Sequence, residues 1–355
     1  MTGLARFEAP ELAGWSWSGL VESTDDAFID GKPMYNGGPH LVGTLRSPVL
    51  ELDPFDDVVP SWTARTPPGT WIETRLRVSF VKRWTRWYSL GVWAEREDPV
   101  ARHSVPRQRD EDAEVVTDTL CLSVAAQTLQ VELALFTLAP DVVPVVTSLT
   151  LTMSMADAPR SFRTERAAWG RVLEVPPRSQ MSYREGGGDA WCSPTSVAMV
   201  LAYHGVEVGV PEAAAETYDW SYGGSGNWPF NTAYAARFGL DAFVARFRSL
   251  LEVERSIVSG IPIVASYAWK EGELQGAPLP SVDGHLGVIV GFDERGDPIV
   301  NDPAGATDDA VRRTYARWEF ERQWLTRSRG AVYVIRPRAI KPPASPPPAP
   351  AADRS

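Results

Sequence analysis

The sequence has few cysteines, no long hydrophobic run and no excess of positive charge. Two of its 355 residues are cysteine, Cys121 and Cys192, so a disulfide framework is not expected, although one bridge remains possible. No stretch approaches the roughly 18 apolar residues of a membrane span. The formal net charge of -10 argues against a nucleic-acid or anionic-membrane partner, because nothing supplies a broad phosphate-binding field.

The bulk composition is that of a soluble globular protein, with 44% hydrophobic and 23% charged residues. A chain of 355 residues suffices for two domains, each with its own core. Residues 1–20 lack a basic stretch followed by an apolar run, so no signal peptide is expected. The interpretation is a cytoplasmic protein, and a mis-assigned start codon would leave secretion open.

Residues 41–160 have the pattern of an all-β domain. Apolar and polar side chains alternate over 72–80 and over 129–135, and 145–153 is a β-branched run. Because strands recur with no convincing helix between them, an antiparallel sandwich is predicted. Residues 1–40 are interpreted as an N-terminal extension. The charged, proline-containing segment 96–114 predicts a long exposed loop.

After a connector at 157–171, the pattern changes to helices first and strands after, which predicts an α+β domain over 172–337. The remaining residues, 338–355, are rich in proline and alanine and predict a disordered tail. Helices are expected over 193–204, 211–216 and 231–238, and strands over 261–267, 287–292, 298–301 and 331–335.

Cys192 stands where a glycine-rich loop, residues 186–188, leads into a helix start. A helix N-terminus carries a partial positive charge and unpaired N–H groups, which favour the reactive thiolate. The N–H of Cys192 would point into the same space and bind a developing oxyanion. The alternative is a buried, unreactive thiol, which is how Cys121 in its strand-like segment is interpreted.

His285 is the best placed of the four histidines to act as a base. A polar turn enters an apolar strand and puts His285 at its mouth, and a hairpin with the next strand would bring Asp302 beside it. His204 lies about three turns from the cysteine on the same helix, too far to reach the thiol. His40 and His103 fall in polar, loop-like segments.

Taken in order, several segments resemble the papain-like cysteine peptidases: Gln180, the run Trp-Cys-Ser-Pro-Thr-Ser-Val-Ala-Met-Val-Leu at 191–201, Gly-His-Leu at 284–286 and Asn-Asp-Pro at 301–303. More closely, they resemble the bacteriocin-processing family that cuts double-glycine leaders, the C39 peptidases, in its stand-alone bacterial form. Segments 223–229 and 260–264 are also similar to that group. The resemblance covers roughly residues 174–337.

The resemblance implies a catalytic role for each matched residue. Cys192 would be the nucleophile, His285 the general base and acid, Asp302 the orienter of the imidazole, and Gln180 a donor to the oxyanion. Ser193 departs from the family, which usually has glycine there. No metal or organic cofactor is implied, and the substrate would be a peptide or protein. The residues expected to contact that substrate are Gly188, Trp191, Gly224, Asn227 and Trp228.

Three functions remain open on the sequence alone. The first is hydrolysis of an amide bond through an acyl-enzyme, and the second is acyl transfer to an amine at the same site. The third is a binding protein with an inactive peptidase-like scaffold, whose β domain recognises a glycan or a protein. The aromatic segment 82–93 would serve that purpose, although filling a core is the favoured interpretation. Trp62, Trp71 and Trp93 are expected in the core.

Overall fold

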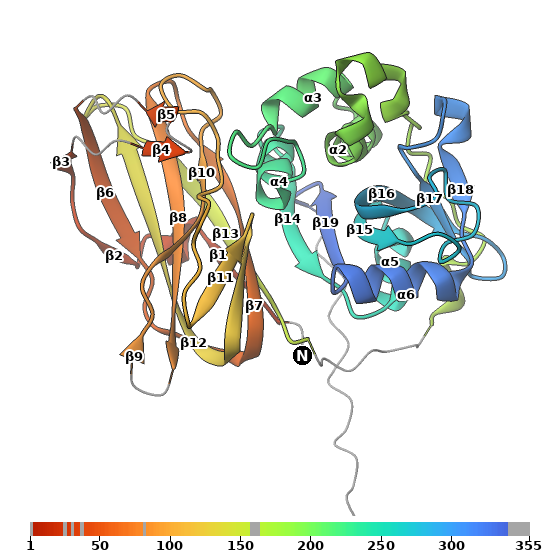
Figure 1. Ribbon diagram of the computed structural model, residues 1–355, viewed down its shortest axis with the longest axis horizontal. Helices are drawn as coiled ribbons and strands as arrows, with labels where there is room; N and C mark the ends of the chain where they lie inside the picture. Colours follow the sequence, from red (N-terminus) through yellow and green to blue (C-terminus); the bar gives the residue numbers. More distant parts are fainter. Residues whose placement is uncertain are drawn as a thin grey trace, which may run out of the picture.

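The computed structural model describes residues 3–23, 27–29, 32–35, 39–80, 83–156 and 164–339. They form two lobes side by side, which we call the β lobe (residues 3–156) and the mixed lobe (residues 164–339) (Figure 1). Most of the tail predicted at 338–355, and part of the connector predicted at 157–171, lie outside the described residues. Within the described ranges, no helix has the length and apolar character needed to span a membrane.

The β lobe is built on an antiparallel sheet of 11 strands. Its strands are β1 (Gly3–Glu8), β2 (Ser16–Trp17), β3 (Val21–Ser23), β6 (His40–Arg46), β7 (Leu50–Arg65), β8 (Thr70–Phe80), β9 (Arg83–Trp84), β10 (Tyr88–Trp93), β11 (Ala113–Val116), β12 (Thr119–Thr137) and β13 (Val145–Ser154). A short helix, α1 (Ala9–Leu12), and a two-stranded ribbon, β4 (Ala27–Ile29) and β5 (Lys32–Tyr35), accompany it.

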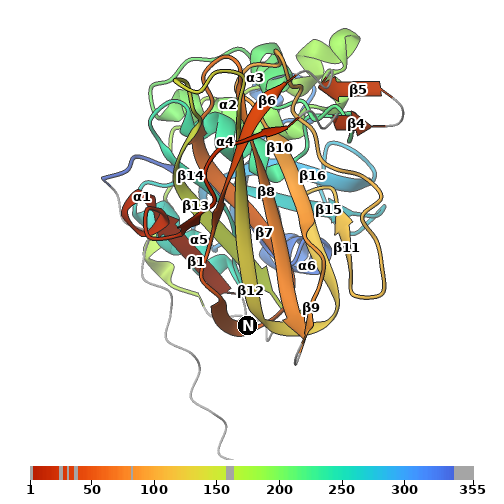
Figure 2. The same ribbon diagram turned by 90° about the vertical axis from the view of Figure 1, so that its left-hand side faces the viewer.

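Two long strands organise this lobe, seen from its outer side in Figure 2. Strand β12 pairs along its length with β6, β7, β8 and β11, and β7 also pairs with β13. The 11 strands are therefore connected by hydrogen bonds into one continuous sheet. The antiparallel pairing agrees with the sequence pattern, and a two-sheet sandwich remains an interpretation of its shape.

The burial of the β lobe confirms one prediction and corrects another. Trp62, Trp71 and Trp93 are 1%, 4% and 0% exposed, as expected for core residues. The segment 96–114 is only partly an exposed loop: residues 96–98 and 109–111 are exposed, whereas Arg102 and His103 are each only 2% exposed. Its buried part is hydrogen-bonded to the mixed lobe through Arg102 and Ser104. Strand β1 pairs with β13, so the start of the predicted N-terminal extension belongs to the sheet.

The mixed lobe places helices on both faces of an antiparallel sheet ordered β14-β19-β15-β16-β17-β18. The strands are β14 (Asp241–Arg246), β15 (Ile263–Trp269), β16 (Val282–Phe292), β17 (Pro298–Asn301), β18 (Arg312–Thr314) and β19 (Ala331–Arg336). The helices are α2 (Cys192–Tyr203), α3 (Val210–Glu216), α4 (Trp228–Ala236), α5 (Leu250–Val258) and α6 (Arg317–Arg327), with short 3-10 turns η1 (Arg166–Ala168), η2 (Gln180–Gly186), η3 (Gly188–Ala190) and η4 (Asp308–Ala310).

Successive side chains of the central strands point to opposite faces of the sheet, so the mixed lobe has one hydrophobic cluster on each face. Val264 of β15 and Val288 of β16 face α2, whereas their neighbours Ile263 and Ile289 join the cluster formed with α5 and α6. Because both faces of the sheet are covered, β15 is buried along its whole length. The cluster on the α2 side continues into the core of the β lobe, so the two lobes share buried surface.

Candidate active site

Cys192 is the first residue of α2, as the sequence predicts, and it is partly exposed. The preceding glycines have different tasks. Gly187 adopts a left-handed conformation with φ 99° and ends η2. Gly188 packs so closely that a Cβ there would lie 2.3 Å from the carbonyl oxygen of Gln180. The glycine run therefore folds the chain tightly from Gln180 to the cysteine.

His285 lies on β16 and meets Asp302 just beyond the end of β17. The two strands are antiparallel, with Val288 opposite Asn301, so the first half of β16 lies beside the end of β17. His285 Nε2 lies 2.8 Å from Asp302 Oδ1. The imidazole and the Cys192 thiol line the same cavity. The structure thus brings together the thiol, the imidazole and the carboxylate that the sequence singled out.

Asp302 is fully buried and accepts hydrogen bonds at both carboxylate oxygens. Oδ1 accepts from the Ala304 N–H at 3.0 Å in addition to its contact with His285. Oδ2 accepts from the hydroxyls of Tyr267, at 2.9 Å, and Tyr315, at 2.7 Å. These two tyrosines were not anticipated from the sequence, because β15 and the segment after β18 meet only in the folded sheet. They hold the carboxylate in one orientation.

The electrostatics favour a charged imidazole at His285. Burial lowers the pKa of His285, but the Asp302 carboxylate and the Cys192 side chain outweigh burial and raise that pKa to about 10. Burial likewise raises the pKa of Asp302, but His285 and the two tyrosine hydroxyls reverse that effect and leave it below its usual value. The histidine therefore keeps its proton near neutral pH.

Gln180 lies in the same cavity as Cys192 and is only 2% exposed. Its Nε2 donates to the carbonyl of Asp189 at 2.9 Å, and its backbone N–H donates to Pro303 O at 2.9 Å. An amide nitrogen carries two hydrogens, so one remains for another acceptor. The backbone bond joins Gln180 to Pro303, the residue that follows Asp302. It therefore fixes the position of Gln180 relative to Asp302.

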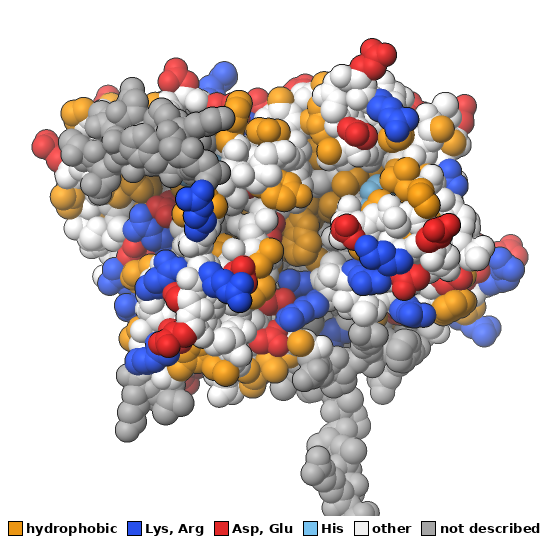
Figure 3. Space-filling view, in the orientation of Figure 1, with side chains coloured by type: hydrophobic (Ala, Val, Ile, Leu, Met, Phe, Trp, Pro, Cys, Tyr) orange, Lys and Arg blue, Asp and Glu red, His pale blue; other side chains and the backbone are white. Residues whose placement is uncertain are grey.

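The cavity above these residues has a volume of about 540 Å³. One wall comes from β15, β16 and the α6 end, and the opposite wall from the segment between α3 and α4, where Tyr222, Gly224 and Trp228 line it. On the face shown in Figure 3, hydrophobic side chains gather in the hollow between the two lobes. The lining of this cavity mixes apolar and polar groups, which suits an organic substrate that also makes hydrogen bonds.

The residues expected to bind substrate divide into two sets. Gly224 and Trp228 line the cavity with Cys192, whereas Trp191 lines a neighbouring groove. Asn227 is fully buried; its side chain caps α4 by accepting from Phe230 N, so its place is structural. Gly188 is buried and packs against the backbone of Gln180 and Tyr183, and it does not line the cavity.

Other polar residues singled out in the sequence have structural partners. The Ser193 hydroxyl lies 2.9 Å from the Tyr333 hydroxyl in the core, which accounts for serine in place of glycine. His204 contacts Ile335 O at 3.1 Å at the far end of α2. His103 is buried in the β lobe, with its Nδ1 2.7 Å from Ala101 O. Burial raises the pKa of Cys121 to about 11, which fits an unreactive thiol.

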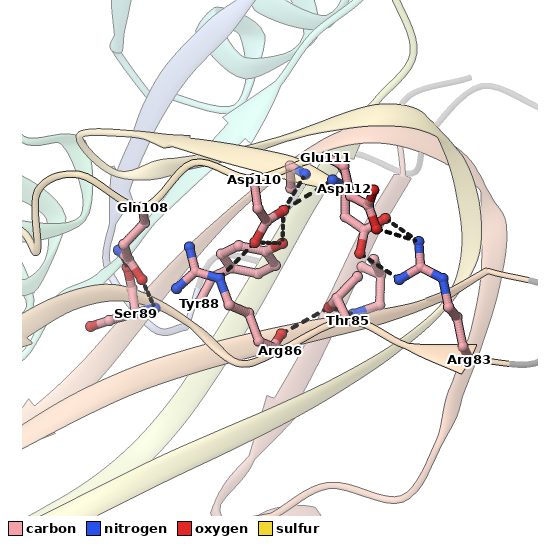
Figure 4. A network of polar contacts seen from close by, with 11 residues as sticks. Arg83, Thr85, Arg86, Tyr88, Ser89, Gln108, Asp110, Glu111 and Asp112 are labelled. Atoms are coloured by element: carbon pink, nitrogen blue, oxygen red, sulfur yellow. Dashed lines mark hydrogen bonds and ion pairs between the residues drawn. The ribbon is translucent and has the colours of Figure 1, made fainter.

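The aromatic segment of the β lobe is held by ion pairs instead of presenting a free platform (Figure 4). Arg83 pairs with Asp112 at 2.6 Å, and Asp110 accepts from Arg86 at 2.6 Å and from the Tyr88 hydroxyl at 2.7 Å.

The two tryptophans of this segment are likewise engaged within the chain. The Arg77 guanidinium lies 4.5 Å from the Trp84 ring centre and 4.6 Å from that of Trp87. Both rings are thus already in contact with a cation. These contacts give no support to the glycan-binding alternative.

Comparison with protein families identifies both lobes. Residues 18–154 match the Peptidase C39 N-terminal domain, and residues 172–332 match the Peptidase_C39 like family. The chain carries C39-peptidase-type domains. The family resemblance inferred from the sequence is thereby confirmed, and the C39-like match indicates cysteine peptidase chemistry for the mixed lobe. Comparison with the curated proteins gave no match.

Two solved structures are similar to about half of the chain. A putative C39-like peptidase from Bacillus anthracis shares 21% identity, covering 46% of this chain and 96% of that one, with a TM-score of 0.34. A double glycine motif protease from an AMS/PCAT transporter, solved in complex with the leader peptide, shares 21% identity, covering 47% and 94% respectively, with a TM-score of 0.32.

Proposed function

We propose that the chain is a thiol-dependent hydrolase of peptide or related amide bonds, with Cys192, His285 and Asp302 as its catalytic residues. The observation that carries the proposal is a buried imidazole that is held by a carboxylate and lines the same cavity as the Cys192 thiol. That thiol starts a helix at the floor of a cavity large enough for a peptide segment.

In the first half-reaction the Cys192 sulfur attacks the carbonyl carbon of the scissile amide. The negative charge moves to the carbonyl oxygen, where the Cys192 N–H and the free amide hydrogen of Gln180 stabilise it. His285 gives its proton to the leaving amine, the C–N bond breaks, and a thioester remains. Asp302 keeps the imidazole oriented and stabilises its charged form throughout.

In the second half-reaction His285, now neutral, takes a proton from water as the water oxygen attacks the thioester. The C–S bond breaks, the acid is released and the thiolate–imidazolium pair is restored. An amine in place of water would give acyl transfer by the same steps. Analysis of the products in the presence of an added amine separates the two reactions.

The proposal is tested by alkylation with iodoacetamide near neutral pH. Cys192 should react much faster than Cys121 in the intact protein, and His285→Ala should remove that advantage because the imidazolium no longer stabilises the thiolate. Cys192→Ser reports the labelling of Cys121 alone. A Cys192 thiol that reacts no faster than glutathione would overturn the proposal. Cleavage of denatured casein, followed by mass spectrometry, tests hydrolysis itself.

A further inference from the structure

The segment between α3 and α4 forms one wall of the cavity, and the β lobe holds that wall from behind. We infer that the β lobe is the positioning element of the substrate site, and that Asp118 of the β lobe and Asp219 of the wall itself are the principal anchors. Only the kinetic test of this inference rests on the proposed function. Tyr222 and Trp228 are the large side chains that this wall presents to the cavity, so they become the specificity-determining residues.

Asp118, in the turn between β11 and β12, anchors the start of α4. Its Oδ2 accepts from the Trp228 N–H at 2.7 Å, and its Oδ1 accepts from the Thr119 hydroxyl at 3.0 Å. Trp228 is the first residue of a nine-residue helix, where an anion also benefits from the helix dipole. Asp118 is only 5% exposed, and burial raises its pKa to about 6 against the opposing effects of Trp228 N–H, Thr119 and Arg246.

Asp219 ties the wall to the β lobe through a second carboxylate. It is fully buried, and its Oδ1 accepts from the Ser104 N–H of the β lobe at 2.9 Å. The same oxygen accepts from the N–H groups of Ser221 and Tyr222, each at 3.0 Å, while Oδ2 accepts from Asn227 Nδ2 at 2.9 Å. One side chain thus joins the base of the wall, its tip and the opposite lobe.

Further contacts continue the same attachment. Trp220 donates its backbone N–H to Arg102 O at 3.0 Å and its Nε1–H to Glu97 at 2.9 Å. Arg102 in turn donates to the carbonyl of Ala215 at 2.8 Å. These bonds explain why the part of segment 96–114 around Arg102 is buried, because it is hydrogen-bonded to the wall of the cavity.

The geometry separates the wall from the reacting groups. The hydrogen bonds of Gln180 and Asp302 described above are made within the mixed lobe, whereas the wall is fixed from the β lobe. Tyr222 lies across the glycines of the wall, since a Cβ on Gly224 would approach its ring to 3.1 Å. Loosening the anchors should therefore weaken substrate binding and leave the chemical step largely intact.

The test compares Asp118→Ala with Asp118→Asn in the full chain. The amide of asparagine keeps an acceptor for the Trp228 N–H, whereas alanine leaves that buried donor unpaired. In Asp118→Ala, hydrogen exchange of amides 219–228 should be about tenfold faster, and in Asp118→Asn close to wild type. Amides of β15 serve as the internal control and should stay protected in both variants.

The kinetic arm uses benzyloxycarbonyl-Phe-Ala-fluoromethyl ketone as a peptide-like probe of Cys192 and iodoacetamide as a small one. For Asp118→Ala the half-saturating concentration of the peptidyl probe should rise several-fold, with its maximal inactivation rate and the iodoacetamide rate nearly unchanged. Asp118→Asn should restore wild-type behaviour.

Unchanged hydrogen exchange of amides 219–228 in Asp118→Ala would overturn the inference. An equal loss of reaction rate with the peptidyl probe and with iodoacetamide would also overturn it. A Cys192 that is inert to both reagents in the wild type would refute the proposed function, and the exchange experiment would still decide on the anchoring. Loss of β15 protection in Asp118→Ala, but not in Asp118→Asn, would assign Asp118 to general folding and also overturn the inference.

Discussion

At the scale of single residues, the site depends on how one carboxylate is held. Asp302 has no exposure to solvent and receives four donors: the His285 ring, the Ala304 N–H and two tyrosine hydroxyls. A buried carboxylate with this many partners stays charged, and its charge keeps His285 protonated. The chemistry proposed for Cys192 therefore depends on a residue that never touches the substrate.

Asp302→Asn should slow the alkylation of Cys192 at pH 7 several-fold. Asparagine keeps an oxygen near the ring but removes the charge that raises the pKa of His285, so a smaller fraction of the imidazole is protonated. The measurement is the iodoacetamide rate as a function of pH. Asp283→Asn, at an exposed carboxylate on the cavity rim, is the matched control and should change the rate little. Equal rates in Asp302→Asn and wild type would contradict this account.

The pH dependence of stability offers a second prediction at this scale. The folded protein binds the His285 proton more tightly than the unfolded chain, since the pKa rises from 6.5 to about 10. This stabilisation is fully present below about pH 6.5 and disappears as the pH rises through about 10. Denaturant unfolding of wild type and His285→Gln should show a stability difference that shrinks between pH 6 and pH 10. A difference independent of pH would refute the shift.

At the scale of elements, steric constraints determine the path of the chain into α2. The chain runs from η2 through η3 into the helix, and Gly188 packs its Cα against the backbone of Gln180 and Tyr183. No side chain can replace that hydrogen unless the backbone shifts. The position of Gln180 relative to Cys192 is therefore a property of this tight fold and not of the two residues alone.

Gly188→Ala should destabilise the protein by about 1–3 kcal/mol and slow the alkylation of Cys192, because its Cβ would meet backbone atoms at 2.3 and 2.7 Å. Gly186→Ala is the matched control, since a Cβ there meets only the Trp191 ring, at 3.6 Å. Denaturant unfolding and the iodoacetamide rate measure the two effects. Similar losses of stability and of alkylation rate in both variants would show that the glycines are needed for backbone flexibility and not because a Cβ would clash.

The elements also show how far a local pattern reaches. Strands β8 and β13 and helices α2 and α3 lie where alternation or capping residues predict them. Helix α6 was not predicted, because its eleven residues carry five charged side chains and little apolar periodicity. It forms because Phe320 and Trp324 fill the core beneath β15. Tertiary packing here overrides a weak local signal.

At the scale of the whole molecule, the two lobes are joined through one aromatic side chain in particular. Phe230 of α4 is fully buried, with its ring centre 6.3 Å from that of Trp62 and 5.5 Å from that of Trp93. A bulge-like glycine, Gly91 with φ 126°, makes room for the ring, since a Cβ there would approach Phe230 to 3.2 Å. The lobes should therefore unfold as a single unit.

Phe230→Ala should lower the free energy of unfolding by about 3–5 kcal/mol, because it removes a large side chain from a packed core and leaves a cavity. Phe230→Leu keeps most of the volume and should lose clearly less. Tryptophan fluorescence and far-UV circular dichroism, followed through a denaturant titration, should report one transition in the wild type. Two separated wild-type transitions would contradict a shared core.

By itself the sequence determined the identity and local setting of the reacting groups: a cysteine at a helix start, a histidine at a strand mouth and an aspartate at the end of the facing strand. These settings depend on residues near in the chain, so local patterns reveal them. Only the tertiary structure decided that Tyr267 and Tyr315 meet at Asp302, that Arg102 is buried and that Asp118 anchors Trp228. Those contacts join residues far apart in the chain, and no local preference for helix, strand or turn encodes which distant surfaces come to pack together.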